Sequence, residues 1–123
     1  MTLSAAISAP FQPVDTVPTA MRGPIDFAFL AGKSGGDRQV ERNVLALLRS
    51  QIGLVLQRAP HASEQELRLM ATAMRGAGRH VGAFAIADAA SDVEKAAPAV
   101  LRLKMQAFTD ALNEAATFLR TLD

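Results

Sequence analysis

The sequence predicts an all-α fold, an antiparallel four-helix bundle preceded by one short additional helix. Half of the 123 residues are apolar, but aromatic residues make up only 5% of the chain. Alanine and leucine are the most frequent apolar residues, and both favour helix over strand. Apolar residues also recur at spacings of three, four and seven along four long segments joined by short connections, which is typical of helices that pack side by side.

Composition and charge exclude several classes of function. The length fits one domain with a modest core, and the net charge of +1 gives no bulk electrostatic reason to bind nucleic acid or an acidic membrane. No apolar run approaches the roughly 18–20 residues that a membrane-spanning helix needs. The chain has no cysteine, which excludes thiolate metal sites and is typical of a cytoplasmic protein. We expect a soluble, cytoplasmic protein, and a monomer rather than a dimer.

The first part of the chain is predicted to be an arm that leads into the bundle. Residues 1–23 contain three of the six prolines and sustain no helical or strand period, so we expect a flexible segment there. The bundle then occupies residues 24–123. Pro24 suits the first turn of a short helix, which three glycines are expected to end: Gly32, Gly35 and Gly36.

The tripeptide Gly32-Lys33-Ser34 has the form of the end of a phosphate-binding loop. That motif needs a glycine five residues before Gly32, where this chain has Phe27, and a preceding strand, which is not apparent. We therefore expect a loop between helices rather than a nucleotide site.

Capping residues mark the next two helices. Asp37 is a suitable N-cap for a helix that runs to about Arg58. Ser63 and Glu66 have the form of a capping box, so a further helix should begin near Glu64 and end at Gly82. The inward residues of the first of these helices are predicted to be Val40, Val44, Leu47, Leu48, Ile52 and Val55.

The helix from Glu64 to Gly82 has two different faces. At about 100° per residue, one face is apolar and buried: Leu67, Met70, Ala71, Met74, Ala77, Gly78 and Val81. The opposite face carries Arg68, Leu69, Thr72, Arg75, Gly76 and Arg79. A solvated face explains this pattern, but an exposed mid-helix glycine costs about 1 kcal/mol relative to alanine. We therefore favour a docking surface for an acidic partner, with Leu69 as its apolar centre.

Two further helices complete the bundle. Gly82 and Ala83 are expected to form a tight turn, after which a helix runs from Phe84 to about Ala97. Pro98 is expected to begin the last helix, because proline is favoured in the first turn. The inward seam of that helix repeats at spacings of four and three: Leu101, Met105, Phe108, Leu112, Ala115, Leu119 and Leu122.

The chain lacks the residue patterns of a catalytic or metal site. His61 is expected in a solvated turn, and His80 at the border of the buried face of its helix. Two separate histidines without a Glu-x-x-His pattern do not predict a metal site, and we expect no cofactor. Asp92 and Glu94 are interpreted as part of a solvated helix face.

The ordered set of residues resembles the histidine-containing phosphotransfer (Hpt) family of two-component phosphorelays. The central helix of that family typically reads A-H-T-L-K-G-S-x-x-N-L-G-A, then x-x-L-A-x-x-A-x-x-L-E. Residues 71–83, ATAMRGAGRHVGA, follow the first part without a gap, and the second part is matched by Ile86, Ala87, Ala90, Val93 and Glu94. The segments IDFAFL at 25–30 and GGD at 35–37 resemble the family's entry motif, so the likeness covers about residues 24–122.

The resemblance implies a phosphotransfer fold in which the acceptor histidine is replaced by Thr72. A histidine accepts a phosphoryl group through a neutral ring nitrogen, whereas a threonine hydroxyl is a poor nucleophile without a base. No residue beside Thr72 is an evident base. Arg75 stands in place of the usual lysine, and Gly76 keeps the space through which a receiver domain approaches.

We therefore hypothesise a non-catalytic, Hpt-like (pseudo-Hpt) module. It would bind a response-regulator receiver or a hybrid histidine kinase and modulate a two-component phosphorelay, with its outward residues 68–79 as the binding surface. Two alternatives stay open. One is an active phosphotransferase that uses His80 as a displaced acceptor, and the other is a helical scaffold or dimerisation domain without a phosphorelay role.

Overall fold

The computed structural model describes residues 23–122, and this part of the chain is helical without any strand. The all-α prediction is therefore confirmed. The predicted arm lies outside the described residues except for Gly23. The elements are α3 (Phe27–Ser34), α4 (Arg38–Arg58), a 3-10 turn η3 (Ala59–His61), α5 (Glu64–Val81), α6 (Phe84–Lys95), a 3-10 turn η4 (Pro98–Val100) and α7 (Leu101–Arg120).

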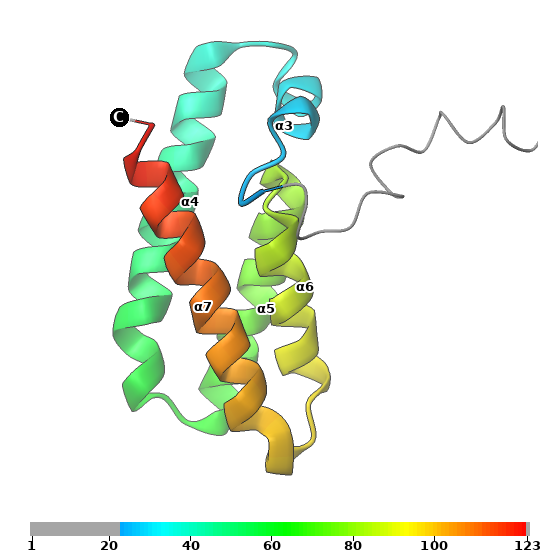
Figure 1. Ribbon diagram of the computed structural model, residues 1–123, viewed down its shortest axis with the longest axis vertical. Helices are drawn as coiled ribbons and strands as arrows, with labels where there is room; N and C mark the ends of the chain where they lie inside the picture. The colour runs from blue at the N-terminus through cyan, green and yellow to red at the C-terminus, as the bar shows by residue number, and fades with distance from the viewer. Residues whose placement is uncertain (1–22, 123) are drawn as a thin grey trace, which may run out of the picture.

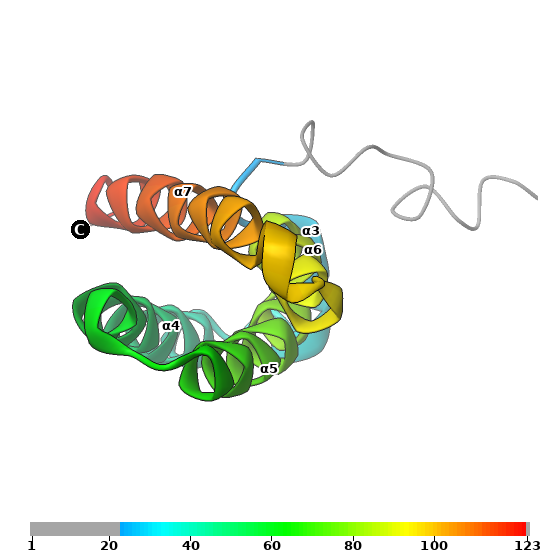
Figure 2. The ribbon, with the colours of Figure 1, turned by 90° about the horizontal axis from the view of Figure 1, so that it is seen from below.

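The four long helices lie side by side, and the chain reverses direction at each connection between them (Figure 1). Seen from below, they follow one another in the order α4, α5, α6, α7 around the interior (Figure 2). The short helix α3 lies at the upper end of the molecule in Figure 1. No helix in the described part of the chain has the length and apolar character needed to cross a membrane.

The core is a single apolar cluster to which every α-helix contributes. Within the described residues, no polar or charged residue is buried. Burying a large apolar side chain stabilises a fold by about 1.5–3 kcal/mol, so the cluster is the main source of stability. Its largest fully buried side chains are Phe108, Leu30, Leu48, Ile52, Met74, Ile86, Leu112 and Val93.

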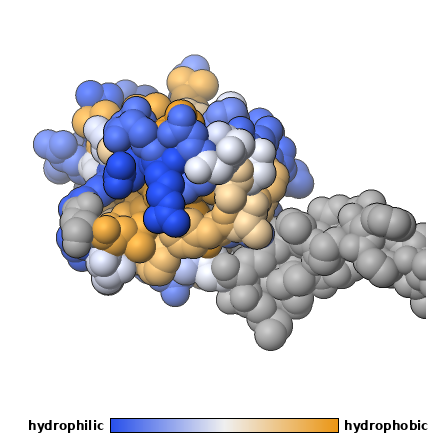
Figure 3. Space-filling model, turned by 90° about the horizontal axis from the view of Figure 1, so that it is seen from above, coloured by the Kyte–Doolittle hydropathy of each residue, from blue (hydrophilic) through white to orange (hydrophobic). Residues whose placement is uncertain are grey.

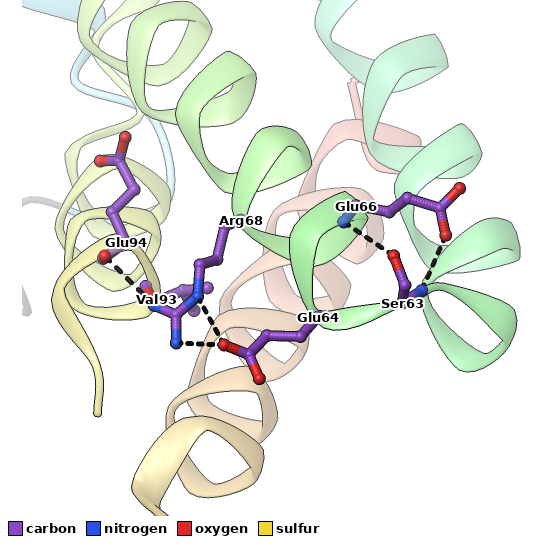
Figure 4. A network of polar contacts seen from close by, with 6 residues as sticks. All are labelled: Ser63, Glu64, Glu66, Arg68, Val93 and Glu94. Carbon is purple, nitrogen blue, oxygen red and sulfur yellow. Dashed lines mark hydrogen bonds and ion pairs between the residues drawn. The ribbon is translucent and has the colours of Figure 1, made fainter. Parts of the chain in front are cut away.

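Side-chain caps determine where three of the helices begin. The Asp37 carboxylate accepts hydrogen bonds from the backbone N–H groups of Gln39 and Val40, which confirms the predicted cap of α4. The Ser63 hydroxyl accepts from the Glu66 N–H at 3.1 Å, and the Glu66 carboxylate accepts from the Ser63 N–H at 2.7 Å (Figure 4). The predicted capping box is therefore present. Caps of this kind stabilise a helix by about 1 kcal/mol each.

The short helix α3 differs from its prediction at both ends. Asp26 is its N-cap, because its carboxylate accepts from the Phe29 N–H at 3.0 Å, so the helix begins after Pro24 rather than at it. Gly32 lies inside the helix, and Gly35 ends it with a left-handed φ of 67°. The segment Gly32–Ser34 is thus the last helical turn and not the expected loop. The Ser34 hydroxyl donates to the Glu41 carboxylate at 2.8 Å, which joins α3 to α4.

The ends of α6 and α7 and one face of α4 also correct the prediction. Helix α6 ends at Lys95, and Pro98 begins a 3-10 turn, so α7 starts only at Leu101. Leu47 and Val40 were expected in the core but are 61% and 42% exposed. At 100° per residue, Leu47 lies a quarter-turn away from the buried row of Leu48, Ile52 and Val55, so these apolar residues belong to two different faces.

Some apolar side chains are exposed at the upper end of the molecule. In Figure 3 an apolar area lies there between hydrophilic surfaces. Phe27 of α3 is 42% exposed, and its ring centroid lies 6.0 Å from that of Phe118 in α7. Leu122, expected in the seam of the last helix, follows the end of α7 and is 46% exposed.

The turn between α5 and α6 depends on two glycines. A Cβ on Gly78 would lie 2.8 Å from the Ala83 carbonyl oxygen and 3.2 Å from the Ala87 nitrogen. Gly82 has a left-handed φ of 87° and ends α5, as the sequence predicted. The Gly82 carbonyl oxygen also accepts from the Asp26 N–H at 2.9 Å. The two helices therefore approach each other with almost no space between their backbones.

This close approach predicts opposite effects of two alanine substitutions. Gly78→Ala should lower the free energy of unfolding by about 1–2 kcal/mol, because the overpacking outweighs the gain in helix propensity. Gly76→Ala is the control, since a Cβ there meets nothing within 4 Å, and it should raise the free energy of unfolding by about 1 kcal/mol. Urea denaturation measures both. A Gly78→Ala variant as stable as the wild type would contradict the close contact.

Candidate functional site

The outward face of α5 is divided into an open part and a bonded part. Leu69 is 63% exposed, Gly76 and Arg79 are exposed, and the space above Gly76 is empty to 4 Å. Arg68 and Arg75 instead lie against α6. The structure therefore brings the six predicted residues onto one face but leaves only some of them available to a partner.

Thr72 and Arg75 are both bonded to Glu94 in the last turn of α6. The Thr72 hydroxyl lies 2.6 Å from the Glu94 carboxylate and 3.0 Å from the Arg68 carbonyl oxygen. Because a hydroxyl has one proton, the shorter, charge-assisted bond to Glu94 is the favoured donation. Arg75 Nη2 donates to the same carboxylate at 3.2 Å. Arg75 Nε is in ion-pair contact with Glu94 Oε1, but its N–H is not aligned for a hydrogen bond.

Arg68 connects α5 to the end of α6. Its Nη1 donates to the carbonyl oxygens of Val93 and Glu94 at 3.1 and 3.3 Å. Its Nε and Nη2 contact the Glu64 carboxylate at 3.2 and 3.0 Å (Figure 4). Carbonyl groups at a helix C-terminus have no partner within the helix and carry a partial negative charge, so a bound cation stabilises that end. Arg68 thus has a structural role between two helices.

Glu94 is a residue of the site that reasoning from the sequence missed. It was expected on a solvated face, but its side chain is only 21% exposed and is bonded to Thr72 and Arg75. The interpretation that no candidate base lies beside Thr72 is also wrong. Glu94 is 22 residues from Thr72 in the chain, so only the turn between the two helices reveals the contact. The available signal was its place as the last residue matched to the Hpt pattern.

The environment of Glu94 makes it a weak base. The hydrogen bond from Thr72 lowers the pKa of its carboxyl group, and the hydrogen bond and charge of Arg75, with the charge of Arg79, lower it further against an opposing desolvation effect. The group is therefore ionised at neutral pH and has little tendency to take a proton from the Thr72 hydroxyl. Its negative charge also repels an incoming phosphoryl group. The arrangement does not activate Thr72 as a nucleophile.

The two histidines lie apart from this cluster. His80 is in the last turn of α5 and is exposed rather than at the border of the core. It follows Thr72 by eight positions, which is about 12 Å along a helix. His61 is exposed in the turn η3, as expected. Residues 23–122 contain no group of three potential metal ligands.

A shallow hollow lies beside Leu69 at the beginning of α5. It has a volume of about 440 Å³ and is lined by Glu64, Gln65, Arg68, Leu69 and Thr72. The Glu64 carboxylate is paired with Arg68 at one side of the hollow. The apolar side chain of Leu69 thus borders a shallow, mostly apolar hollow with one ion pair at its edge, an arrangement that suits contact with a protein better than enclosure of a small ligand.

The pKa of Glu94 predicts a pH-dependent contribution to stability. A carboxyl group whose pKa is lower in the folded than in the unfolded state stabilises the fold above its unfolded pKa, and this contribution is lost as the pH falls through the folded pKa. Glu94→Gln should therefore be less stable than the wild type at pH 7. The difference should shrink once the pH falls below 4.5, the ordinary value for this group.

Urea denaturation at several pH values measures this difference. Glu114→Gln is a matched control, because Glu114 is exposed on α7 and its substitution should have little effect at any pH. A stability difference for Glu94→Gln that stays constant from neutral to acid pH would show that the charge of Glu94 is not what stabilises the cluster.

Comparisons with protein-family models, with curated proteins and with solved structures returned no match for this chain. The likeness to the phosphotransfer family therefore consists of the motif residues named above.

Proposed function

We propose that this protein is a pseudo-Hpt module, which binds the receiver domain of a response regulator or hybrid histidine kinase and modulates a two-component phosphorelay without transferring phosphate. The proposal is supported mainly by the residue at the acceptor position. Thr72 stands there, bonded to the ionised Glu94, while Leu69 and Gly76 beside it stay open.

The proposed fold is an antiparallel four-helix bundle of α4 to α7, with α3 as the short additional helix. It is supported by the alternating direction of the long helices (Figure 1) and by the shared apolar core. In such a bundle α5 would be the recognition helix, since it carries both the matched motif and the open residues.

The chemistry of the cluster supports binding without transfer. A phosphoacceptor needs a nucleophile with a free electron pair and a route for its proton. The Thr72 hydroxyl would have to pass its proton to a carboxylate with a lowered pKa. Arg75, which by the resemblance would attract the phosphoryl group, is already paired with Glu94. Each element that an active site needs is therefore held in another interaction.

The open part of the face supports docking of a protein. Leu69 provides an exposed apolar anchor of the kind found at the centre of interfaces. Gly76, about 10 Å further along the helix, lets a partner come close to the backbone. Arg79 adds a positive charge near Gly76, which complements the acidic phosphorylation pocket that the resemblance implies for a receiver.

Exposure of His80 favours the second candidate, a phosphotransferase with a displaced acceptor. An imidazole open to solvent can meet a phosphorylated receiver. Incubation with a phosphorylated receiver distinguishes the two functions. Acid-labile phosphate on the wild type that is absent from His80→Ala would support transfer, and unlabelled protein that nevertheless binds would support the pseudo-Hpt module.

The docking surface predicts which substitutions weaken receiver binding. Leu69→Arg and Gly76→Glu should each weaken it at least about tenfold, because they place a bulky charge at an apolar anchor or at a point of close approach. Leu103→Arg is the control, since Leu103 is 68% exposed on α7. A pull-down with receiver domains of the same organism followed by calorimetry measures binding. Unchanged binding by both α5 variants would show that the surface is elsewhere.

Restoring the acceptor should restore transfer in steps. Thr72→His alone places an imidazole beside Glu94, which would keep the ring protonated and a poor acceptor. The double variant, which combines Thr72→His with Glu94→Ala, should therefore take more phosphate label from a phosphorylated receiver than the single variant Thr72→His does. The wild type should take none. Leu103→His, with a histidine on α7, controls for adventitious labelling. A double variant that binds the receiver but takes no label would contradict the placement of Thr72 at the acceptor position.

A further inference from the structure

A second hollow lies at the lower end of the molecule, where α4 ends and α7 begins (Figure 2). This lower hollow has a volume of about 660 Å³, which lies within the range of about 300–1,000 Å³ that is usual for small-molecule sites. Residues of α4, α5, α7 and both 3-10 turns line it. It is thus bordered by several elements, whereas the hollow beside Leu69 is lined by residues of α5.

The lower hollow has an apolar wall that belongs to the edge of the core. Leu101 is 7% exposed and is a member of the core cluster, against which Leu56 and Met105 pack. Leu67 is partly buried and lines the same hollow. A hydrocarbon group that entered would leave water for contact with these side chains, and each methylene group buried in this way tightens binding up to about fourfold. The wall therefore suits an aliphatic ligand.

Prolines stand in both of the 3-10 turns that border the lower hollow. Pro60 lies at the beginning of η3 and Pro98 at the beginning of η4, and both line the hollow. The proline ring fixes the backbone angle φ, so these two turns have little freedom to close over the space between them. A hollow that is formed before a ligand arrives costs less conformational entropy on binding.

The lining contains two charged side chains, of which Arg102 has no partner within residues 23–122. The other, Glu64, is paired with Arg68 at 3.0 Å. Arg102 is exposed near the start of α7 and forms no ion pair or hydrogen bond with this part of the chain. An unpaired guanidinium group can bind a carboxylate through two parallel hydrogen bonds.

Polar groups further along α7 are already bonded to one another. The Gln106 side chain donates to the Asp110 carboxylate at 2.9 Å, and the Thr109 hydroxyl donates to the Gln106 carbonyl oxygen at 3.0 Å. Asp110 follows Arg102 by eight positions, which is about 12 Å along a helix. This distance exceeds the Debye length of about 8 Å at physiological ionic strength, so Asp110 does not neutralise Arg102. The unpaired charge of the lining is therefore positive.

We propose that the lower hollow binds an aliphatic carboxylate, with the hydrocarbon chain against Leu56, Leu101 and Met105 and the carboxylate paired with Arg102. A ligand of this class satisfies both features of the hollow. A neutral apolar molecule would leave Arg102 without a partner, and an inorganic anion would leave the apolar wall in contact with water. The lower hollow contains none of the open residues of the α5 face, so the proposal goes beyond the proposed function and does not rest on it.

Calorimetric titration of the full-length chain with decanoate tests the site. Decanoate should bind saturably, with one molecule per chain, and about tenfold more tightly than octanoate, because it buries two more methylene groups. Decyltrimethylammonium has the same chain length and the opposite charge, so it should bind at least about fivefold more weakly than decanoate. Uptake of decanoate that does not saturate, equal affinity for the two amphiphiles, or no binding of decanoate up to millimolar concentrations would overturn the proposal.

Reversing the charge of Arg102 should reverse this preference. Arg102→Glu should weaken the binding of decanoate at least about tenfold and tighten that of decyltrimethylammonium, because it replaces attraction by repulsion at the end of the hollow. Arg120→Glu is the matched control, since Arg120 is exposed at the other end of the same helix and its substitution changes the net charge by the same amount. If the two variants bind decanoate alike, Arg102 does not hold the carboxylate and the proposal fails.

Amide NMR spectra of the full-length chain locate the bound ligand. Decanoate should shift the backbone signals of residues 56–67 and 98–109, which include the lining of the lower hollow. Leu47 and Leu69 are 61% and 63% exposed and offer apolar surface outside the lower hollow. Shifts centred on either of these two residues would show that decanoate binds to exposed apolar side chains instead, and would overturn the assignment of the site.

Discussion

The close approach of α5 and α6 is the constraint on which the site depends. Gly78 allows the Ala83 carbonyl oxygen to come within 2.8 Å of where a Cβ would be, and Gly82 turns the chain with a left-handed φ. Residues that are 22 positions apart in the chain can then share a hydrogen bond. Arg68 fixes the far end of the same pair of helices by bonding the last carbonyl groups of α6. Without this pairing Thr72 and Arg75 would be ordinary residues of a solvated face.

This geometry changes the interpretation of the cationic face of α5. Three arginines on one side of a helix suggest a positive surface, but Arg68 is bonded to Glu64 and to α6, and Arg75 is bonded to Glu94. The open residues are Leu69, Gly76 and Arg79, which form a largely apolar surface with one charge at its end. A partner that docks there would be held mainly by shape and apolar contact, with electrostatics as a contribution to specificity.

Much of the fold could be predicted from the sequence because it depends on local chemistry, whereas the contacts between helices could not be predicted. The caps at Asp37 and Ser63 and the turn at Gly82 depend on neighbouring residues, and the structure contains all three. The prediction of Leu47 as buried was wrong because apolar residues on α4 occupy two faces, and spacing alone does not tell which one meets the core. Glu94 was missed because its partner lies on another helix, and the start of α3 because the Asp26 cap takes precedence over the preference of Pro24.

The bond between Thr72 and Glu94 also bears on how such a module would act in a cell. In an active phosphotransfer protein, each copy takes up a phosphoryl group and passes it on many times. A module whose acceptor position holds a threonine bonded to its own carboxylate would have no phosphorylated form, so each copy could occupy only one receiver at a time. In the proposed function its influence on the relay would follow its copy number relative to that of the receiver. Gene dosage, rather than the flux of phosphate, would then set the strength of the response.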